Sequence, residues 1–222
     1  MTVDWSAAWV TFRLAWWTTG ILLCLGMPLA WWLVRTEFRG KAVVEAMIAL
    51  PLVLPPTVLG FYVLTGVGPN SFLGRGYERL VGSPLPFSFA GIVIGSVLFN
   101  LPFAVRPFMA AFQAVDRRLI EASWCLGVSR VGTFFRVVLP LSWPGILAGM
   151  VLTFAHTVGE FGVVLMLGGN IPGQTRTLSI AVYDQVQALE YEAAGQTSLA
   201  LVIFSFAALL LIALLQRRAA SP

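Results

Sequence analysis

His156 and Glu160 are the residues whose types and spacing first point to chemistry. They are four positions apart, so on a helix the two side chains would share one face. An imidazole and a carboxylate can exchange a proton or bind a metal ion. A tightly held metal needs three or four ligands, and no second ligand cluster occurs in the sequence. We therefore expect a hydrogen-bonded histidine and no metal, and a hydrolase that uses this pair stays as an alternative.

The sequence lacks the catalytic motifs that would identify an enzyme. Its one Gly-Lys pair, Gly40-Lys41, is followed by Ala42 and does not have the spacing of a P-loop. Neither the zinc-protease motif H-E-x-x-H nor the nucleophile elbow G-x-S-x-G occurs. We predict no catalytic residue and no cofactor, and any energy source must lie in another protein.

The elements that must position these residues are long apolar helices, since 58% of the residues are hydrophobic and only 11% are charged. A membrane span needs about 20 apolar residues, and five stretches pass this test. They are predicted at 9–34, 44–66, 86–110, 140–167 and 194–216, within one domain over 9–214. In lipid each backbone amide must be satisfied within its own segment, so the fold class is all-α, a polytopic membrane helix bundle.

Prolines interrupt the first two spans, at Pro28 and at Pro51, Pro55 and Pro56. Each removes a backbone hydrogen bond and tends to kink its helix. Fixed packing geometry and a helix that moves along a pathway are both open interpretations of these kinks.

The basic residues divide unevenly between the two sides of the membrane. If five helices alternate, ten of the 14 lie on the side of the C-terminus, three lie on the other, and Arg13 begins the first span. The ten are Arg35, Arg39, Lys41, Arg106, Arg117, Arg118, Arg130, Arg136, Arg217 and Arg218. The positive-inside rule then places the N-terminus outside and the C-terminus in the cytoplasm. Contact with the lipid of the inner leaflet explains the net charge of +4 without any nucleic acid.

A polar segment, about 116–138, separates the third span from the fourth on the cytoplasmic side. Asp116 is a good N-cap for a helix over Arg117 to Leu126, and Gly127 occupies the position of a left-handed C-cap. A second short helix is predicted from Ser129 to Val138, before Pro140 begins the next span. Such short helices are unstable alone in water. They either pack back against their own spans or fill a groove on a soluble protein.

This segment resembles the EAA signature of type I ABC importer permeases, E-A-A-x3-G-x9-I-x-L-P. The matching residues are Glu121, Ala122, Ser123, Gly127, Val137, Leu139 and Pro140, with Ser123 in place of the second Ala and Val137 in place of Ile. Three further stretches, 50–64, 153–177 and 188–195, resemble the molybdate branch of these permeases. The sulfate-type permeases are similar to it.

The resemblance implies a permease for molybdate, with tungstate or sulfate/thiosulfate as alternatives. It implies that two copies of the chain enclose the pathway, with a cytoplasmic ABC ATPase dimer below and an external oxyanion-binding protein above. Residues Glu121, Ala122, Ser123, Gly127, Leu139 and Pro140 would couple to the ATPase. An intramembrane hydrolase and an ion channel remain alternatives of other classes, and both would act without an ATPase.

The candidate pathway residues are polar groups within or beside the spans. About 20 residues after Pro140, at 1.5 Å each, Glu160 is predicted about 30 Å along its helix, near the outer interface. There it is either a solvated carboxylate or, with Gly159, a hinge or gate, and it would repel an oxyanion. Asn100, Thr57, Thr153 and Thr157 are neutral donors that suit transient anion contact. Arg106 either reaches the inner headgroups or lines the exit.

Overall fold

The chain is a bundle of helices, described in a computed structural model for the backbone of residues 4–220 and the side chains of residues 4–214. Four helices are long and apolar enough to cross a membrane, and a bent pair brings the number of candidate spans to five. The four are α1 (Trp5–Arg35), α5 (Phe89–Gln113), α8 (Leu139–Val158) together with the turns before it, and α11 (Tyr191–Ala220). The all-α class is confirmed for the described residues.

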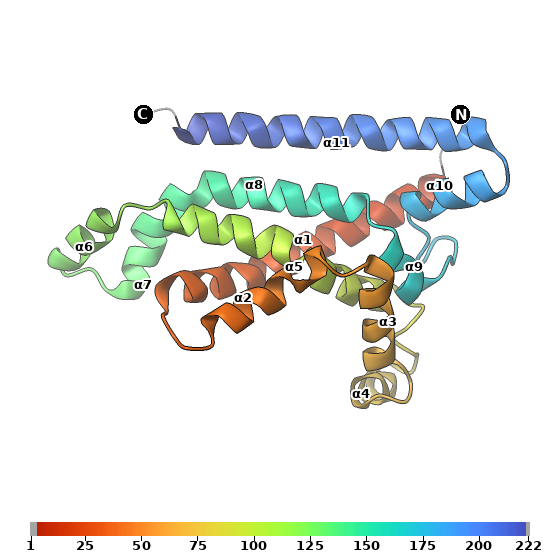
Figure 1. The fold of residues 1–222 in the computed structure, drawn as a ribbon, viewed down its shortest axis with the longest axis horizontal. Coiled ribbons are helices and arrows are strands. Elements are labelled where there is room, and N and C mark those ends of the chain that lie inside the picture. Colours follow the sequence, from red (N-terminus) through yellow and green to blue (C-terminus); the bar gives the residue numbers. More distant parts are fainter. Residues whose placement is uncertain (1–3, 221–222) are drawn as a thin grey trace.

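The centre of the bundle is formed by α1, α5 and α8, which pack along one another (Figure 1). Asp4 caps α1 by accepting hydrogen bonds from the Ser6 and Ala7 amides, and Ser88 caps α5 by accepting from Gly91. Two apolar clusters fill the interior. One surrounds Phe108 and Ile146 towards α6, and the other surrounds Leu14 and Leu167 towards α9.

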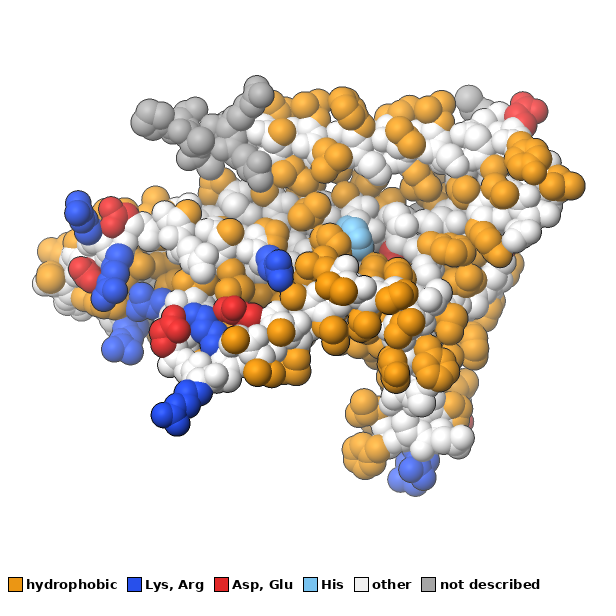
Figure 2. Space-filling view, in the orientation of Figure 1, with side chains coloured by type: hydrophobic (Ala, Val, Ile, Leu, Met, Phe, Trp, Pro, Cys, Tyr) orange, Lys and Arg blue, Asp and Glu red, His pale blue; other side chains and the backbone are white. Residues whose placement is uncertain are grey.

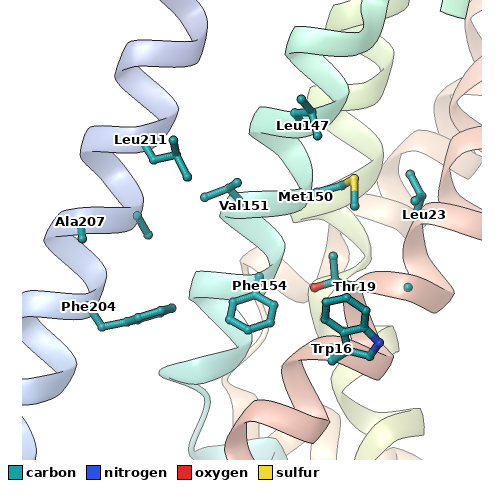
Figure 3. A pocket seen from close by; sticks show the side chains of 12 residues that line it. Trp16, Thr19, Leu23, Leu147, Met150, Val151, Phe154, Phe204, Ala207 and Leu211 are labelled. Carbon is teal, nitrogen blue, oxygen red and sulfur yellow. The ribbon is translucent and has the colours of Figure 1, made fainter.

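Helix α11 lies along α8 at one side of the bundle and is only lightly covered (Figure 1). Between α11 and the pair α1 and α8 there is an apolar groove of about 580 Å³. Figure 3 shows Phe204 and Leu211 of α11 on one side of the groove, with Phe154, Val151 and Trp16 opposite. Such a surface suits hydrocarbon and not water.

The second predicted span, 44–66, is broken in the structure. It consists of α2 (Lys41–Ala49), a 3-10 turn η1 (Leu50–Leu52) and α3 (Pro56–Val67), with a bend of 112° between the two halves. Pro55 is the N-cap of α3 and Pro56 is its first residue. Proline is favourable at the start of a helix and unfavourable inside one, so the adjacent prolines end one helix and begin the next.

The fourth predicted span, 140–167, is also not a single helix. Helix α8 ends at Val158, and the chain turns at residues 159–161 before α9 (Gly162–Gly168). A Cβ at Gly162 would lie 2.8 Å from the Pro56 Cβ, so glycine is what lets α9 approach α3 this closely. The two predicted spans therefore break side by side.

The end of the molecule at which α1 begins carries α10 (Leu178–Gln187), while α4 (Phe72–Val81) packs against α3. Arg176 joins this end to the start of α1, since it donates to Asp184 and Asn170 and lies 3.7 Å from Asp4. The side-chain hydrogen bond from Ser6 is the main cause that lowers the pKa of the Asp4 carboxyl. Helices α6 (Arg117–Cys125) and α7 (Arg130–Thr133) lie at the opposite end, where most of the visible basic side chains gather (Figures 1 and 2).

Candidate functional site

The first candidate site is the polar segment between α5 and α8. Asp116 caps α6 by accepting from the Arg118 amide at 2.8 Å, and Gly127 has a φ of 77°, as its C-cap position requires. Both features agree with the sequence-based prediction. The second short helix does not end before Pro140, because α7 continues through a π-helical segment, η2 (Phe134–Val138), directly into α8.

The π-helical segment explains how a proline enters this continuous helix. The Leu139 amide donates to the Phe134 carbonyl, five residues back. Pro140 has no amide hydrogen, and a widened turn gives its ring room beside the preceding backbone. Leu139 packs against the apolar cluster around Phe108, while Pro140 is exposed. Leu139 of the EAA signature thus anchors the segment to the bundle.

Ser123 joins the two short helices of the segment. Its hydroxyl lies 2.7 Å from the Thr133 hydroxyl and 2.9 Å from the Ile120 carbonyl, and both hydroxyl-bearing residues are buried. Ile120 and Ser123 are therefore the face that packs back on the chain. Leu119, four residues before Ser123, points outwards. Serine in place of the family's alanine adds a hydrogen bond between α6 and α7.

Replacing Ser123 with alanine should weaken the packing of α6 on α7 without preventing membrane insertion. One neutral buried hydrogen bond contributes about 1 kcal/mol, which for a chain of this size shifts the melting temperature by about 2–4 °C. Thermal melts of S123A, of T133V and of the double variant in detergent measure this. We expect the two losses to be less than additive, and strict additivity would contradict the coupling.

The outer face of the segment exposes apolar side chains beside charged ones. Leu126 is 84% exposed and Val131 is 67% exposed, on either side of the turn at Gly127. Glu121 is half exposed and pairs with Arg117 at 2.8 Å. Arg35 of α1 lies over the Trp124 ring, 5.3 Å from its centroid, and so supports α6 from the bundle side. The knob formed by residues 116–138 thus presents a mixed apolar and charged surface.

The second candidate site is a cavity of about 620 Å³ where the two broken spans meet. It is bounded by α3, α5, the end of α8 and the turn before α9. Its lining residues are Pro56, Thr57, Phe99, Ala155, His156, Gly159, Glu160, Phe161 and Gly162. Figure 2 shows the single histidine at the surface of this face, beside an acidic side chain.

Glu160 lies inside the protein at the edge of this cavity and is 4% exposed. One carboxylate oxygen, Oε2, accepts from the Ser96 hydroxyl at 2.8 Å and from Asn100 Nδ2 at 2.9 Å. The other, Oε1, is buried and has no partner among the described residues. Of the two interpretations left open for Glu160, the solvated carboxylate is therefore wrong, because the turn at 159–161 directs the side chain towards α5.

Asn100 connects Glu160 to His156. Its Oδ1 lies 2.8 Å from His156 Nδ1, while its Nδ2 also donates to the Ser96 carbonyl at 2.9 Å. His156 and Glu160 are thus both hydrogen-bonded to the side-chain amide of Asn100. They do not share a helical face, since α8 ends before Glu160. The imidazole stacks on Phe103 at 3.7 Å between ring centroids.

Three of the other predicted pathway residues, Thr153, Thr157 and Arg106, do not line this cavity. Thr153 and Thr157 are buried and donate to the Gly149 and Thr153 carbonyls, one turn back, so their hydroxyls do not face the cavity. Arg106 is exposed and lines a separate, smaller pocket of about 250 Å³ with Glu45. Thr57 and Gly159 do line the cavity.

Sequence reasoning missed Ser96. The available signal was its spacing, because Ser96 and Asn100 are four residues apart and are the two polar side chains in the run from Gly95 to Val105. Two polar groups on one face of a membrane helix call for a polar partner. That the partner is Glu160, 60 residues further along than Asn100, required the tertiary structure.

Comparisons with known proteins agree with this architecture. The family described as "Binding-protein-dependent transport system inner membrane component" matches residues 23–221. The molybdenum transport system permease protein ModB of Azotobacter vinelandii is 49% identical over 215 residues, covering 97% of this chain and 94% of that protein. A probable sulfate transport system permease protein, cysT of Anthoceros angustus, is 33% identical over 93% of this chain and 72% of its own.

Among solved structures, a chain of the inward-facing MetNI methionine ABC transporter superposes with a TM-score of 0.72. It is 17% identical, and the match covers 97% of this chain and 95% of that one. At this identity the likeness shows the fold alone.

Proposed function

The chain belongs to the family of binding-protein-dependent transport system inner membrane components, and we infer from this that it is the permease subunit of an ABC importer for molybdate. The observation that carries the substrate is the 49% identity to a molybdenum permease over nearly the whole length of both proteins. Tungstate is nearly isosteric with molybdate and is the first alternative cargo. The relative named for sulfate transport makes sulfate/thiosulfate the second.

The knob at residues 116–138 is the docking element for the ATPase subunits, which supply the energy. Its exposed apolar side chains are flanked by charged neighbours and held in place by the Ser123–Thr133 contact. A mixed surface of this kind fits a cleft on a soluble partner. Closure of two ATPase subunits around ATP would move two such knobs together and switch the spans between inward-open and outward-open states.

A second copy of the chain completes the pathway. Along α5, residues at helical spacing lie on one side that the rest of the chain leaves half buried or exposed: Phe99, Phe103, Arg106, Ala110 and Gln113. This open side runs from the cavity at His156 towards the knob. The same side of a second copy, related by two-fold symmetry, would enclose a passage between them. Arg106 lies along this passage as an anion contact near the inner exit.

Glu160, Gly159 and Asn100 form the gate region near the outer end. They lie where both broken spans can bend and where α8 meets α9. The N-terminus is outside and the C-terminus is cytoplasmic, which places the basic end of Figure 2 inside. Lipid hydrocarbon covers the apolar groove beside α11 (Figure 3).

Reconstitution tests this function. The purified permease, its ATPase and its oxyanion-binding protein are placed in proteoliposomes, and uptake of molybdate is measured with and without ATP. We expect uptake only with all three proteins and with ATP, and competition by tungstate at similar concentrations. Competition by sulfate at equal concentration would favour the sulfate alternative. Hydrolysis or conductance by the permease alone would contradict the transport role.

A further inference from the structure

We propose that His156 is the residue that hydrogen-bonds the oxyanion in the cavity, and that Asn100 and Glu160 position it and compensate its charge. The inference rests on the proposed function and extends it to a specific contact. The imidazole takes up a hydrogen ion from the aqueous solution as the anion enters, donates its Nε2 hydrogen to an oxyanion oxygen, and releases the hydrogen ion to the solution when the anion leaves.

The direction of the hydrogen bonds determines which imidazole nitrogen faces the cargo. Asn100 Nδ2 donates to two acceptors, the Ser96 carbonyl and Glu160 Oε2. A flipped amide would place Oδ1 against both of these oxygens with no hydrogen between them, so the orientation of the amide is fixed. Asn100 Oδ1 is therefore an acceptor, and His156 Nδ1 must carry the hydrogen that lies between them. The neutral imidazole is then protonated at Nδ1 and bare at Nε2.

The bare nitrogen is the accessible one. Within the described part of the chain, Nε2 makes no hydrogen bond and is not among the buried atoms without partners, while the ring itself lines the cavity. The His156 ring stacks on the Phe103 ring, and its centroid lies 5.4 Å from the centroid of the Phe99 ring. These contacts restrict the orientation of the imidazole. A bare Nε2 repels an anion, whereas a protonated one donates to it.

Glu160 is suited to compensate the charge of the imidazolium. Among the described residues that line the cavity it is the second titratable group, and α3 contributes Pro56 and Thr57, α5 contributes Phe99, and the turn before α9 contributes Phe161. Arg106 and Glu45 face the separate pocket. A carboxylate linked through the Asn100 amide to the far nitrogen of the ring stabilises positive charge on that ring.

A single histidine makes the protonation state directly measurable. The permease, labelled with 15N in its imidazole and purified with a histidine-free tag, is combined with its unlabelled ATPase in nanodiscs. Without cargo we expect one protonated nitrogen, Nδ1, and one bare nitrogen, Nε2. Addition of molybdate should convert the spectrum to that of an imidazolium with two protonated nitrogens. The opposite tautomer, or no change with molybdate, would overturn the proposal.

Transport assays with two variants separate this role from a structural one. H156Q can still donate to Asn100 but cannot carry a charge, so its molybdate uptake should fall about 10-fold or more, the effect of losing one hydrogen bond to a charged group. Its melting temperature in detergent should stay close to that of the unmodified permease, because the amide keeps the contact to Asn100. E160Q should keep the Nδ1 tautomer but show less imidazolium with molybdate. Normal uptake by H156Q would refute this inference alone, whereas absence of uptake by the unmodified permease would refute the proposed function.

Discussion

Replacing Glu160 with alanine should abolish molybdate uptake and make the permease less stable. The change leaves the Ser96 hydroxyl and one Asn100 hydrogen without their buried acceptor, at a cost of about 1–3 kcal/mol for each unsatisfied group. It also removes the contact that holds the turn at 159–161 against α5. We expect a lower melting temperature in detergent, because buried donors lose their acceptor. Molybdate uptake should be more than about 100-fold below normal, because the released turn also misplaces the residues of the proposed gate.

E160Q is the matched control for this variant. Its amide keeps one oxygen that can accept from Ser96 and Asn100, and its nitrogen takes the place of Oε1, which has no partner in the described structure. The melting temperature of E160Q should therefore be lowered less than the melting temperature of E160A, relative to the unmodified permease. If E160A melted and transported normally, the buried cluster would have no part in the gate.

Replacing Gly127 with valine should uncouple ATP hydrolysis from transport while the protein still inserts. Gly127 has a φ of 77°, and a Cβ there would meet nothing within 4 Å, so the constraint is conformational and not steric crowding by neighbours. The left-handed conformation costs other residues about 1–2 kcal/mol, and a branched side chain most. The turn between α6 and α7 would open and displace the docking knob. Stimulation of the ATPase and uptake of molybdate should both fall about 10-fold or more, as for loss of a binding hot spot.

G127N provides the control at the same position, because asparagine tolerates the left-handed conformation. It should retain most of the coupling that G127V loses. E121A supplies a different comparison. The Glu121–Arg117 pair is exposed and worth little to folding, so a loss of coupling in E121A with an unchanged melting temperature would come from the partner contact. Equal transport by G127V, G127N and the unmodified chain would argue against docking through this knob.

The local features of the chain were predictable from its sequence. Apolar length predicted the membrane spans, because lipid leaves the backbone few alternatives to a helix. The cap at Asp116 and the left-handed turn at Gly127 were predictable for a similar reason, since each depends on the backbone preference of one residue. The EAA signature indicated the family, because its residues lie at fixed spacings within one short segment.

Tertiary contacts decided the rest. Hydropathy cannot distinguish one long span from two helices with a bend of 112° between them, because apolar residues, Val53 and Leu54, continue through the break. Nor could it place Glu160, whose burial depends on Ser96 and Asn100 from another span. The sequence determined which segments are apolar enough to enter the membrane and which one is polar between them, since these depend on local composition. Where a buried carboxylate finds its hydrogen-bond donors depends on how distant segments pack, and only the folded chain brings those segments together.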